Sequence, residues 1–215
     1  MFHRIVQNLI AIILLLFVAS NAFALPAIYN IILDGTSSIS EEDFHKANEQ
    51  IVKFAELLNA RSQTNIGERA DMLTVNYFGA HKQYDGTIFI NCSDAEKLNV
   101  LYYMLLTKEH PKFGATAIYS AIAVATAEVM LKDKELPGEY LRSIILITDG
   151  EDNDSPADIK NKIRQIFPNP KINLFVISVG TSKTSEFEGV ADKVIPINDF
   201  GSLGAALVIT TQILR

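Results

Sequence analysis

Cysteine is almost absent from this chain of 215 residues. Its one cysteine, Cys92, has no partner for a disulfide within the chain, so the fold must be held by its hydrophobic core rather than by bridges. Hydrophobic residues make up 48% of the sequence, and a domain of this length can bury a full core. The sequence therefore indicates one globular domain without disulfides.

Positive charge and the common enzyme motifs are also scarce. The chain has 19 Lys and Arg against 25 Asp and Glu, a net charge of −6, and it has no basic run, so we expect no nucleic-acid binding. It contains no glycine-rich phosphate loop and no Gly-x-Ser-x-Gly elbow. The histidines after residue 24, which are His45, His81 and His110, are far apart in sequence. We therefore expect a protein that is not an enzyme.

Long hydrophobic runs are confined to the N-terminus. Arg4 gives a positive start, residues 9–18 form an apolar core, and Ala22-Phe23-Ala24 is a small-x-small cleavage site. This pattern predicts a signal peptide at residues 1–24, cleaved after Ala24, and a single domain at residues 25–215. The mature protein is then secreted or periplasmic, and we expect no membrane span in it, since a span needs about 20 apolar residues.

Strand and helix patterns alternate along the rest of the chain, which is typical of an α/β sheet. Nearly continuous apolar runs of the kind found in buried parallel strands occur in the segments 28–33, 143–148 and 174–179, with a shorter one at 193–197. Between them, helices are predicted from Ser40, from Ser93 to about Leu106, over 115–131, from Ser155, and at the C-terminus. Residues 72–78 and 87–90 are predicted to form a hairpin whose second strand is the antiparallel edge. The expected fold is a doubly wound, mostly parallel α/β sheet with helices on both faces.

Oxygen-bearing side chains follow two of these strands and precede one helix. Asp34, Thr36 and Ser38 come directly after the first strand, Asp149 follows the strand at 143–148, and Thr116 lies at the start of the helix at 115–131. Ligands of open α/β sheets bind outside the carboxyl ends of the strands, so these groups are expected to converge there. Hydroxyl and carboxylate oxygens are the ligands that hard divalent cations prefer.

The motifs Asp-x-Thr-x-Ser, Gly-x-Thr and Thr-Asp-Gly, in this order and on these elements, resemble the von Willebrand factor type A (vWA) family, which includes the integrin I domains. The resemblance extends from about Pro26 to Arg215. It implies a Rossmann-like fold and a metal-ion-dependent adhesion site that holds Mg²⁺ or Mn²⁺, with Ca²⁺ also possible. The chain departs from the family at Thr36, where the family usually has serine; threonine keeps the hydroxyl but adds a methyl group.

What the resemblance implies about function is adhesion. Thr36, Ser38 and Thr116 would be hydroxyl ligands of the metal, and Asp34 and Asp149 would act mainly through water. The metal would bridge to an Asp or Glu carboxylate of a protein partner. The rim that selects this partner is expected to include the following residues: His110, Lys112, Phe113, Glu151, Asp152 and Asp154.

Two alternatives compete with this interpretation. The chain is also consistent with a structural vWA module whose metal site is vestigial or only stabilising. A remote alternative is a phosphatase similar to the haloacid dehalogenases, because Asp34-Gly35-Thr36 and Asp149-Gly150 look like that family's first and last motifs. That family needs a nucleophilic aspartate two residues before Asp34, where this chain has Ile32.

Overall fold

A seven-stranded sheet forms the centre of the molecule in the computed structural model, which describes residues 25–64, 69–180 and 184–214. The strands are β1 (Ala27–Asp34), β2 (Met72–Phe78), β3 (Tyr84–Gly86), β4 (Ile90–Asn91), β5 (Leu141–Thr148), β6 (Asn173–Val179) and β7 (Lys193–Ile197). Their order is β3-β2-β1-β5-β6-β7, with β4 also paired to β2. All pairings are parallel except those of β3 and β4, so the expected mostly parallel sheet with an antiparallel edge is confirmed.

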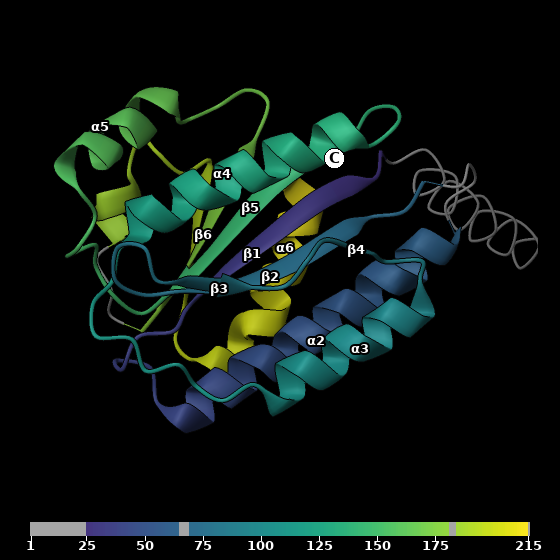
Figure 1. Cartoon of the computed structure of the whole chain (residues 1–215), viewed down its shortest axis with the longest axis horizontal. Helices are drawn as coiled ribbons and strands as arrows, with labels where there is room; N and C mark the ends of the chain where they lie inside the picture. Colours follow the sequence, from purple (N-terminus) through teal and green to yellow (C-terminus); the bar gives the residue numbers. More distant parts are fainter. Residues whose placement is uncertain (1–24, 65–68, 181–183, 215) are drawn as a thin grey trace, which may run out of the picture.

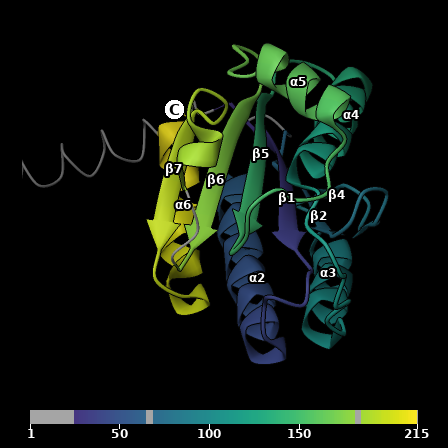
Figure 2. The ribbon, with the colours of Figure 1, turned by 90° about the vertical axis from the view of Figure 1, so that its left-hand side faces the viewer.

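Helices cover both faces of this sheet (Figure 1). One face carries α2 (Glu41–Thr64), α3 (Ala95–Thr107) and α6 (Leu203–Ile213), and the other carries α4 (Ile118–Glu135) and α5 (Ala157–Ile166). Two short 3-10 helices, η1 (Thr184–Phe187) and η2 (Phe200–Ser202), complete the elements. In Figure 2, turned by 90° from the view of Figure 1, α4 and α5 again lie apart from α2 and α3.

The central strand β1 shows why the sequence gives two cores. All eight of its residues are buried, and alternate side chains point to opposite faces. Tyr29, Ile31 and Leu33 belong to the core under α2, α3 and α6, whereas Ile28 and Ile32 belong to the core under α4 and α5. A strand covered on both faces must be apolar at nearly every position. This is why the sequence shows a nearly continuous apolar run at residues 28–33.

The antiparallel edge differs from the predicted single strand at residues 87–90. It consists of two short pieces, β3 and β4, because Thr87 interrupts the ladder: its hydroxyl, not a main-chain carbonyl, accepts the Val75 N–H at 3.0 Å. The Thr87 N–H still donates to the Val75 carbonyl. A hydroxyl that competes for a ladder hydrogen bond is a local effect that strand periodicity does not reveal.

Three helix starts differ from the predicted ones. α3 is capped by Asp94, which accepts the Lys97 N–H at 3.1 Å, and not by Ser93. α5 begins after Pro156, since the Ser155 hydroxyl donates to Asp152 instead of capping its own helix. α4 begins at Ile118, three residues after the predicted start. Ser40 caps α2 as predicted, since its hydroxyl accepts the Asp43 N–H; the Asp43 carboxylate accepts the Ser40 hydroxyl and not its N–H, so the box is only half formed.

The predicted signal peptide, residues 1–24, lies outside the described residues. Within the described part of the chain, no helix has the length and apolarity needed to cross a membrane.

Candidate metal centre

The floor of the candidate site is the carboxylate of Asp34 at the carboxyl end of β1. Asp34 is fully buried, and it accepts hydrogen bonds from the Thr36 N–H at 3.0 Å and from the Thr148 hydroxyl at 2.7 Å. Thr148 is the last residue of β5, the neighbouring strand, and its hydroxyl also accepts the Gly150 N–H at 3.0 Å. Sequence analysis missed this supporting role of Thr148, although its position beside Asp149 was a usable signal.

The loop after β1 carries two further predicted ligands, and it joins them to Asp149. The hydroxyls of Thr36 and Ser38 lie 2.8 Å apart, and the Ser38 hydroxyl donates to Asp149 Oδ1 at 2.8 Å. Thr36 is buried, Asp149 half-buried and Ser38 exposed. The three side chains therefore form a continuous row of oxygens that leads from the floor of the site to solvent.

Thr116 joins this group from the segment before α4. A Cβ atom built on Gly150 would lie 3.7 Å from Thr116 Oγ1 and 3.9 Å from Asp34 Oδ2, which places both oxygens beside the same glycine. Thr116 is not the N-cap of α4, a position that Ala117 occupies. Its hydroxyl is therefore not committed to the helix. All five predicted residues come together at one edge of the sheet.

Main-chain hydrogen bonds lock the three loops against one another. The Phe113 N–H donates to the Gly35 carbonyl at 2.9 Å, and the Ser37 N–H donates to the Phe113 carbonyl at 3.0 Å. The Ala117 N–H donates to the Gly79 carbonyl at 2.8 Å. A Cβ atom on Gly79 would lie 2.1 Å from the Cβ of Phe113, so this close approach of two loops requires glycine. The positions of the oxygens are thus fixed by backbone and not by side-chain contacts alone.

His110 is better described as a support of the site than as part of its rim. Its Nε2 lies 3.1 Å from the Thr36 carbonyl oxygen, and its ring stacks on Phe44 of α2 at a centroid distance of 4.7 Å. Burial lowers the pKa of His110, which favours the neutral imidazole. Since Phe44 is 66 residues away in sequence, no local pattern could have revealed this packing.

The acidic segment after Asp149 is also mostly structural. Asp152 accepts the Tyr119 N–H at 3.4 Å and the Lys160 ammonium at 3.3 Å, and Asn153 accepts the Thr116 N–H at 2.9 Å. Asp154 accepts the His81 N–H at 2.6 Å. Asp152 thus caps the N-terminus of α4, whose first N–H groups have no partner within the helix, and Asn153 binds the segment just before it. The rim interpretation is therefore wrong for Asp152, whereas Asp154 is exposed and stays a rim prediction.

Lys112 remains on the rim. It is exposed, adopts a left-handed backbone conformation with φ of 52°, and its ammonium lies 2.9 Å from the Glu41 carboxylate. Both members of this pair are more than half exposed, so the pair is weak and can open for a partner.

The electrostatics of the floor favour a cation. Burial raises the pKa of the Asp34 carboxyl, the hydrogen bonds from Thr148 and Thr36 oppose this rise, and the nearby Asp149 carboxylate adds to it. A divalent cation beside these oxygens would relieve both the desolvation and the repulsion. Among the described residues, no three His, Cys, Asp or Glu side chains are arranged so that they could hold a metal ion, so hydroxyls must supply much of any coordination sphere here. The donor set fits a hard cation that prefers oxygen, such as Mg²⁺.

Comparison with known proteins gives the same family by an independent route. The family model described as von Willebrand factor type A domain matches residues 30–198. A search of curated protein sequences finds no relative.

Solved structures share the fold at low sequence identity. Proximal thread matrix protein 1 (PTMP1) from the mussel byssus superposes with a TM-score of 0.67 at 15% identity, over 86% of this chain and 47% of that one. A second structure of PTMP1, with 17% identity and a TM-score of 0.65, is described as having a zinc-occupied metal-ion-dependent adhesion site. The pilus adhesin SpaC from Lactobacillus rhamnosus GG superposes with a TM-score of 0.68 at 8% identity, over 89% of this chain and 30% of that one. This chain thus spans less than half the length of each of these proteins.

Proposed function

This chain belongs to the von Willebrand factor type A family, and on that premise we propose that it binds a divalent metal ion and, through the metal, a carboxylate of a partner protein. The observation that carries the proposal is the convergence of three hydroxyls and two carboxylates, Asp34, Thr36, Ser38, Thr116 and Asp149, at the carboxyl edge of the sheet. We infer a binding role and not a catalytic one.

The chemistry of this donor set supports an adhesive use of the metal. Hydroxyl ligands are neutral, so a Mg²⁺ or Mn²⁺ ion held by Thr36, Ser38 and Thr116 keeps most of its positive charge. The Asp34 carboxylate accepts two hydrogen bonds inside the protein and the Asp149 carboxylate accepts one. This favours contact between these carboxylates and the metal through water over direct ligation. An electron-poor ion near solvent attracts an anionic oxygen, and Asp and Glu carboxylates are the protein groups that supply one. Lys112 and Glu41 lie at the rim where such a partner would approach.

Two features of the structure weigh against the alternatives. Ile32, at the position where a dehalogenase-like enzyme needs its nucleophile, is fully buried in the core under α4. A purely vestigial site is disfavoured by the exposed row of oxygens, which continues from the buried floor to Ser38. The similar proteins come from a byssus and from a pilus, which supports a secreted or surface location for this chain.

The proposal is tested by calorimetric titration of the chain from Leu25 to Arg215 with Mg²⁺, Mn²⁺, Ca²⁺ and Zn²⁺. We expect saturable binding by the wild type, and we expect Asp149→Ala to weaken it by at least about tenfold because a carboxylate next to the ion is lost. Asp158→Ala is the matched control: it removes an exposed carboxylate on α5 that pairs only with Lys162, and it should bind as the wild type does.

The partner chemistry is tested in the same protein by adding capped aspartate or its amide, asparagine, to the metal-loaded form. We expect the capped aspartate to bind and the capped asparagine not to bind. We also expect EDTA to abolish the binding of the aspartate. A folded wild type that binds no metal, with or without the aspartate, would favour the structural module.

Two substitutions of Thr36 separate the contribution of its hydroxyl to metal affinity from that of its methyl group. Thr36→Val keeps the shape but removes the oxygen, so we expect metal affinity to fall by about tenfold or more. Thr36→Ser keeps the oxygen and loosens its χ1 rotamer, so we expect affinity equal to the wild type or a few-fold tighter. Titration of both variants with Mn²⁺ measures the difference; equal affinity of the valine variant and the wild type would remove Thr36 from the ligand set.

A further inference from the structure

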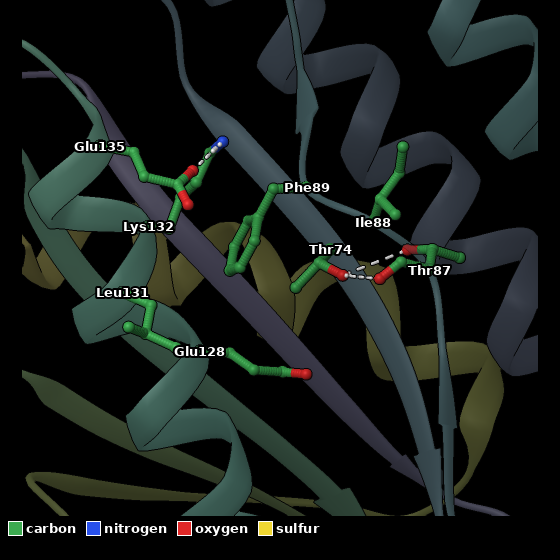
Figure 3. Close-up of a pocket in the computed structure, with 8 residues that line it drawn as sticks. All are labelled: Thr74, Thr87, Ile88, Phe89, Glu128, Leu131, Lys132 and Glu135. Carbon is green, nitrogen blue, oxygen red and sulfur yellow. Dashed lines mark hydrogen bonds and ion pairs between the residues drawn. The ribbon is translucent and has the colours of Figure 1, made fainter.

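A cleft of about 470 Å³ opens between α4 and the edge of the sheet, and it shares no residue with the metal centre. Its apolar walls are Phe89, Ile88 and Leu131, and the last two are 77% and 61% exposed. Figure 3 shows the ring of Phe89 between Thr74 on one side and the Lys132–Glu135 pair on the other. Glu128 extends from α4 toward the Thr74 side of the cleft (Figure 3).

The carboxylate of Glu128 is held in place by three neutral donors on one oxygen. Its Oε2 accepts hydrogen bonds from the side-chain amides of Asn30 at 2.8 Å and Asn76 at 3.1 Å, and from the hydroxyl of Tyr84 at 3.0 Å. Asn76 also donates to the Asn30 side chain at 2.8 Å, so the donors are themselves ordered. Asn30 and Asn76 are 0% and 1% exposed, which makes this a buried polar network in the middle of the sheet.

The negative charge of Glu128 has no counterion in the part of the chain that the structure describes. All three donors are neutral, and Lys132, one helical turn further along α4, extends to Glu135 at 3.0 Å instead. The other oxygen, Oε1, receives no hydrogen bond from the described residues and is not among their buried unsatisfied atoms, so it faces solvent in the cleft. A half-buried carboxylate is normally paired, and here the open side is the cleft.

We propose that this cleft binds the side chain of a lysine presented by a partner polypeptide, with its ammonium on Glu128 and its aliphatic stem between Phe89 and Leu131. The two ends of such a side chain match the cleft, because lysine buries its stem on apolar surface while its charged head takes hydrogen bonds. An arginine fits less well. Its planar fork is recognised by both oxygens of a carboxylate, and Oε2 of Glu128 is already occupied by three donors.

The cleft also offers the aromatic ring of Phe89 beside the carboxylate, and a cation near an aromatic face gains further attraction. The site would therefore add a second contact to a partner, independent of the metal. The cleft shares no residue with the metal centre. A test of lysine binding and a test of metal binding are therefore independent of each other.

The test is a titration of isotopically labelled protein, residues 25–215 in EDTA, with three capped tripeptides followed by NMR. The peptides are glycyl-lysyl-glycine, its norleucine analogue, which has the same stem without the ammonium, and its arginine analogue. We expect saturable shifts at Thr74, Phe89 and Leu131 with the lysine peptide and binding at least about tenfold weaker with the other two. Equal binding of the lysine and norleucine peptides, or no saturable shift, would overturn the proposal. Shifts with n-butylammonium but not with the lysine peptide would show a small-amine site instead.

Variants make the assignment specific. Glu128→Gln keeps an acceptor for the network but removes the charge, so the lysine peptide should lose at least about tenfold in affinity. Glu49→Gln makes the same change at an exposed residue of α2, on the opposite face of the sheet. This control variant should bind the lysine peptide as the wild type does. If Glu128→Gln does not fold, Leu131→Lys places a competing ammonium at the exposed mouth of the cleft without touching the network, and it should abolish binding. Unchanged binding in a folded variant of either kind would contradict the site.

Discussion

Replacing Asp71 by alanine is expected to lower the free energy of unfolding by about 3–5 kcal/mol, the cost of removing one partner from a buried ion pair. Asp71 is fully buried just before β2, and its carboxylate is bound by both the Nε and an Nη group of Arg61 from the last turn of α2. The variant would leave the Arg61 guanidinium, whose side chain is only 13% exposed, without its counterion.

The loss extends beyond the pair because Asp71 also holds the start of the central strand. Its Oδ1 accepts the N–H of Ala27, the first residue of β1, at 2.8 Å. Arg61 in turn donates to the hydroxyl of Tyr29 at 3.1 Å. The main chain of Asp71 is tied on both sides as well, to the Ser62 hydroxyl and to the Cys92 N–H. The carboxylate thus connects α2 to β1, and the main chain of the same residue connects to the segment after β4.

Urea unfolding of the chain from Leu25, followed by circular dichroism in EDTA, measures this effect. Glu42→Ala is the control, since it breaks an exposed pair with Lys46 and should change the free energy by less than about 1 kcal/mol. Arg61→Leu and the double variant complete a cycle in which the coupling energy should be large. A change below about 1 kcal/mol for Asp71→Ala would mean that water replaces the lost carboxylate beside Arg61, and the pair would then be structurally unimportant.

The sequence predicted the sheet well because buried parallel strands leave a strong pattern. The runs at residues 28–33, 143–148 and 174–179 all became central strands, and the site residues at their ends followed from topology alone. The five predicted ligands converge because the carboxyl ends of neighbouring parallel strands, here β1 and β5, must lie at one edge.

What the sequence did not predict depends on contacts between distant residues. Thr87, Asp152 and Ser155 each accept a main-chain N–H from a distant segment with a side-chain oxygen. These contacts divided an edge strand, turned a rim candidate into a helix cap and moved a helix start. These hydrogen bonds join residues 12, 33 and 35 positions apart, and hydrophobic periodicity carries no information about them. Glu128 gave no signal for the same reason, since its partners Asn30 and Asn76 come from two other elements.

The last prediction concerns Asp34, where metal binding and stability should oppose each other. Asp34→Asn keeps the size of the side chain and an acceptor for the Thr36 N–H, while the Thr148 hydroxyl can accept from the new amide. The change removes a charge that burial and Asp149 both disfavour, as the raised pKa of Asp34 shows. We therefore expect the metal-free variant to be more stable than the metal-free wild type near neutral pH.

The sign of the pH dependence follows from the same raised pKa. The folded wild type binds the proton on Asp34 more tightly than the unfolded chain does. Its stability relative to Asp34→Asn should therefore improve as the pH falls through the raised pKa of the folded state toward the ordinary pKa of 3.8. The difference between the two proteins should thus be largest near neutral pH and shrink in acid. Urea unfolding in EDTA at several pH values measures it; a variant less stable than the wild type at neutral pH would contradict the argument.

Metal should reverse this order, because the charge that weakens the empty fold is the charge that attracts the cation. At a free Mg²⁺ concentration 100 times its dissociation constant, the wild type should gain about 2.7 kcal/mol, and Asp34→Asn should gain almost nothing at the same concentration. Asp158→Asn, an exposed change of the same kind, should follow the wild type in both conditions. Such a result would explain a buried carboxylate at the end of β1 that lowers the stability of the metal-free protein by the metal that it helps to bind. If Mg²⁺ stabilised both proteins equally, Asp34 would have no part in binding and the metal centre would have to be sought without it.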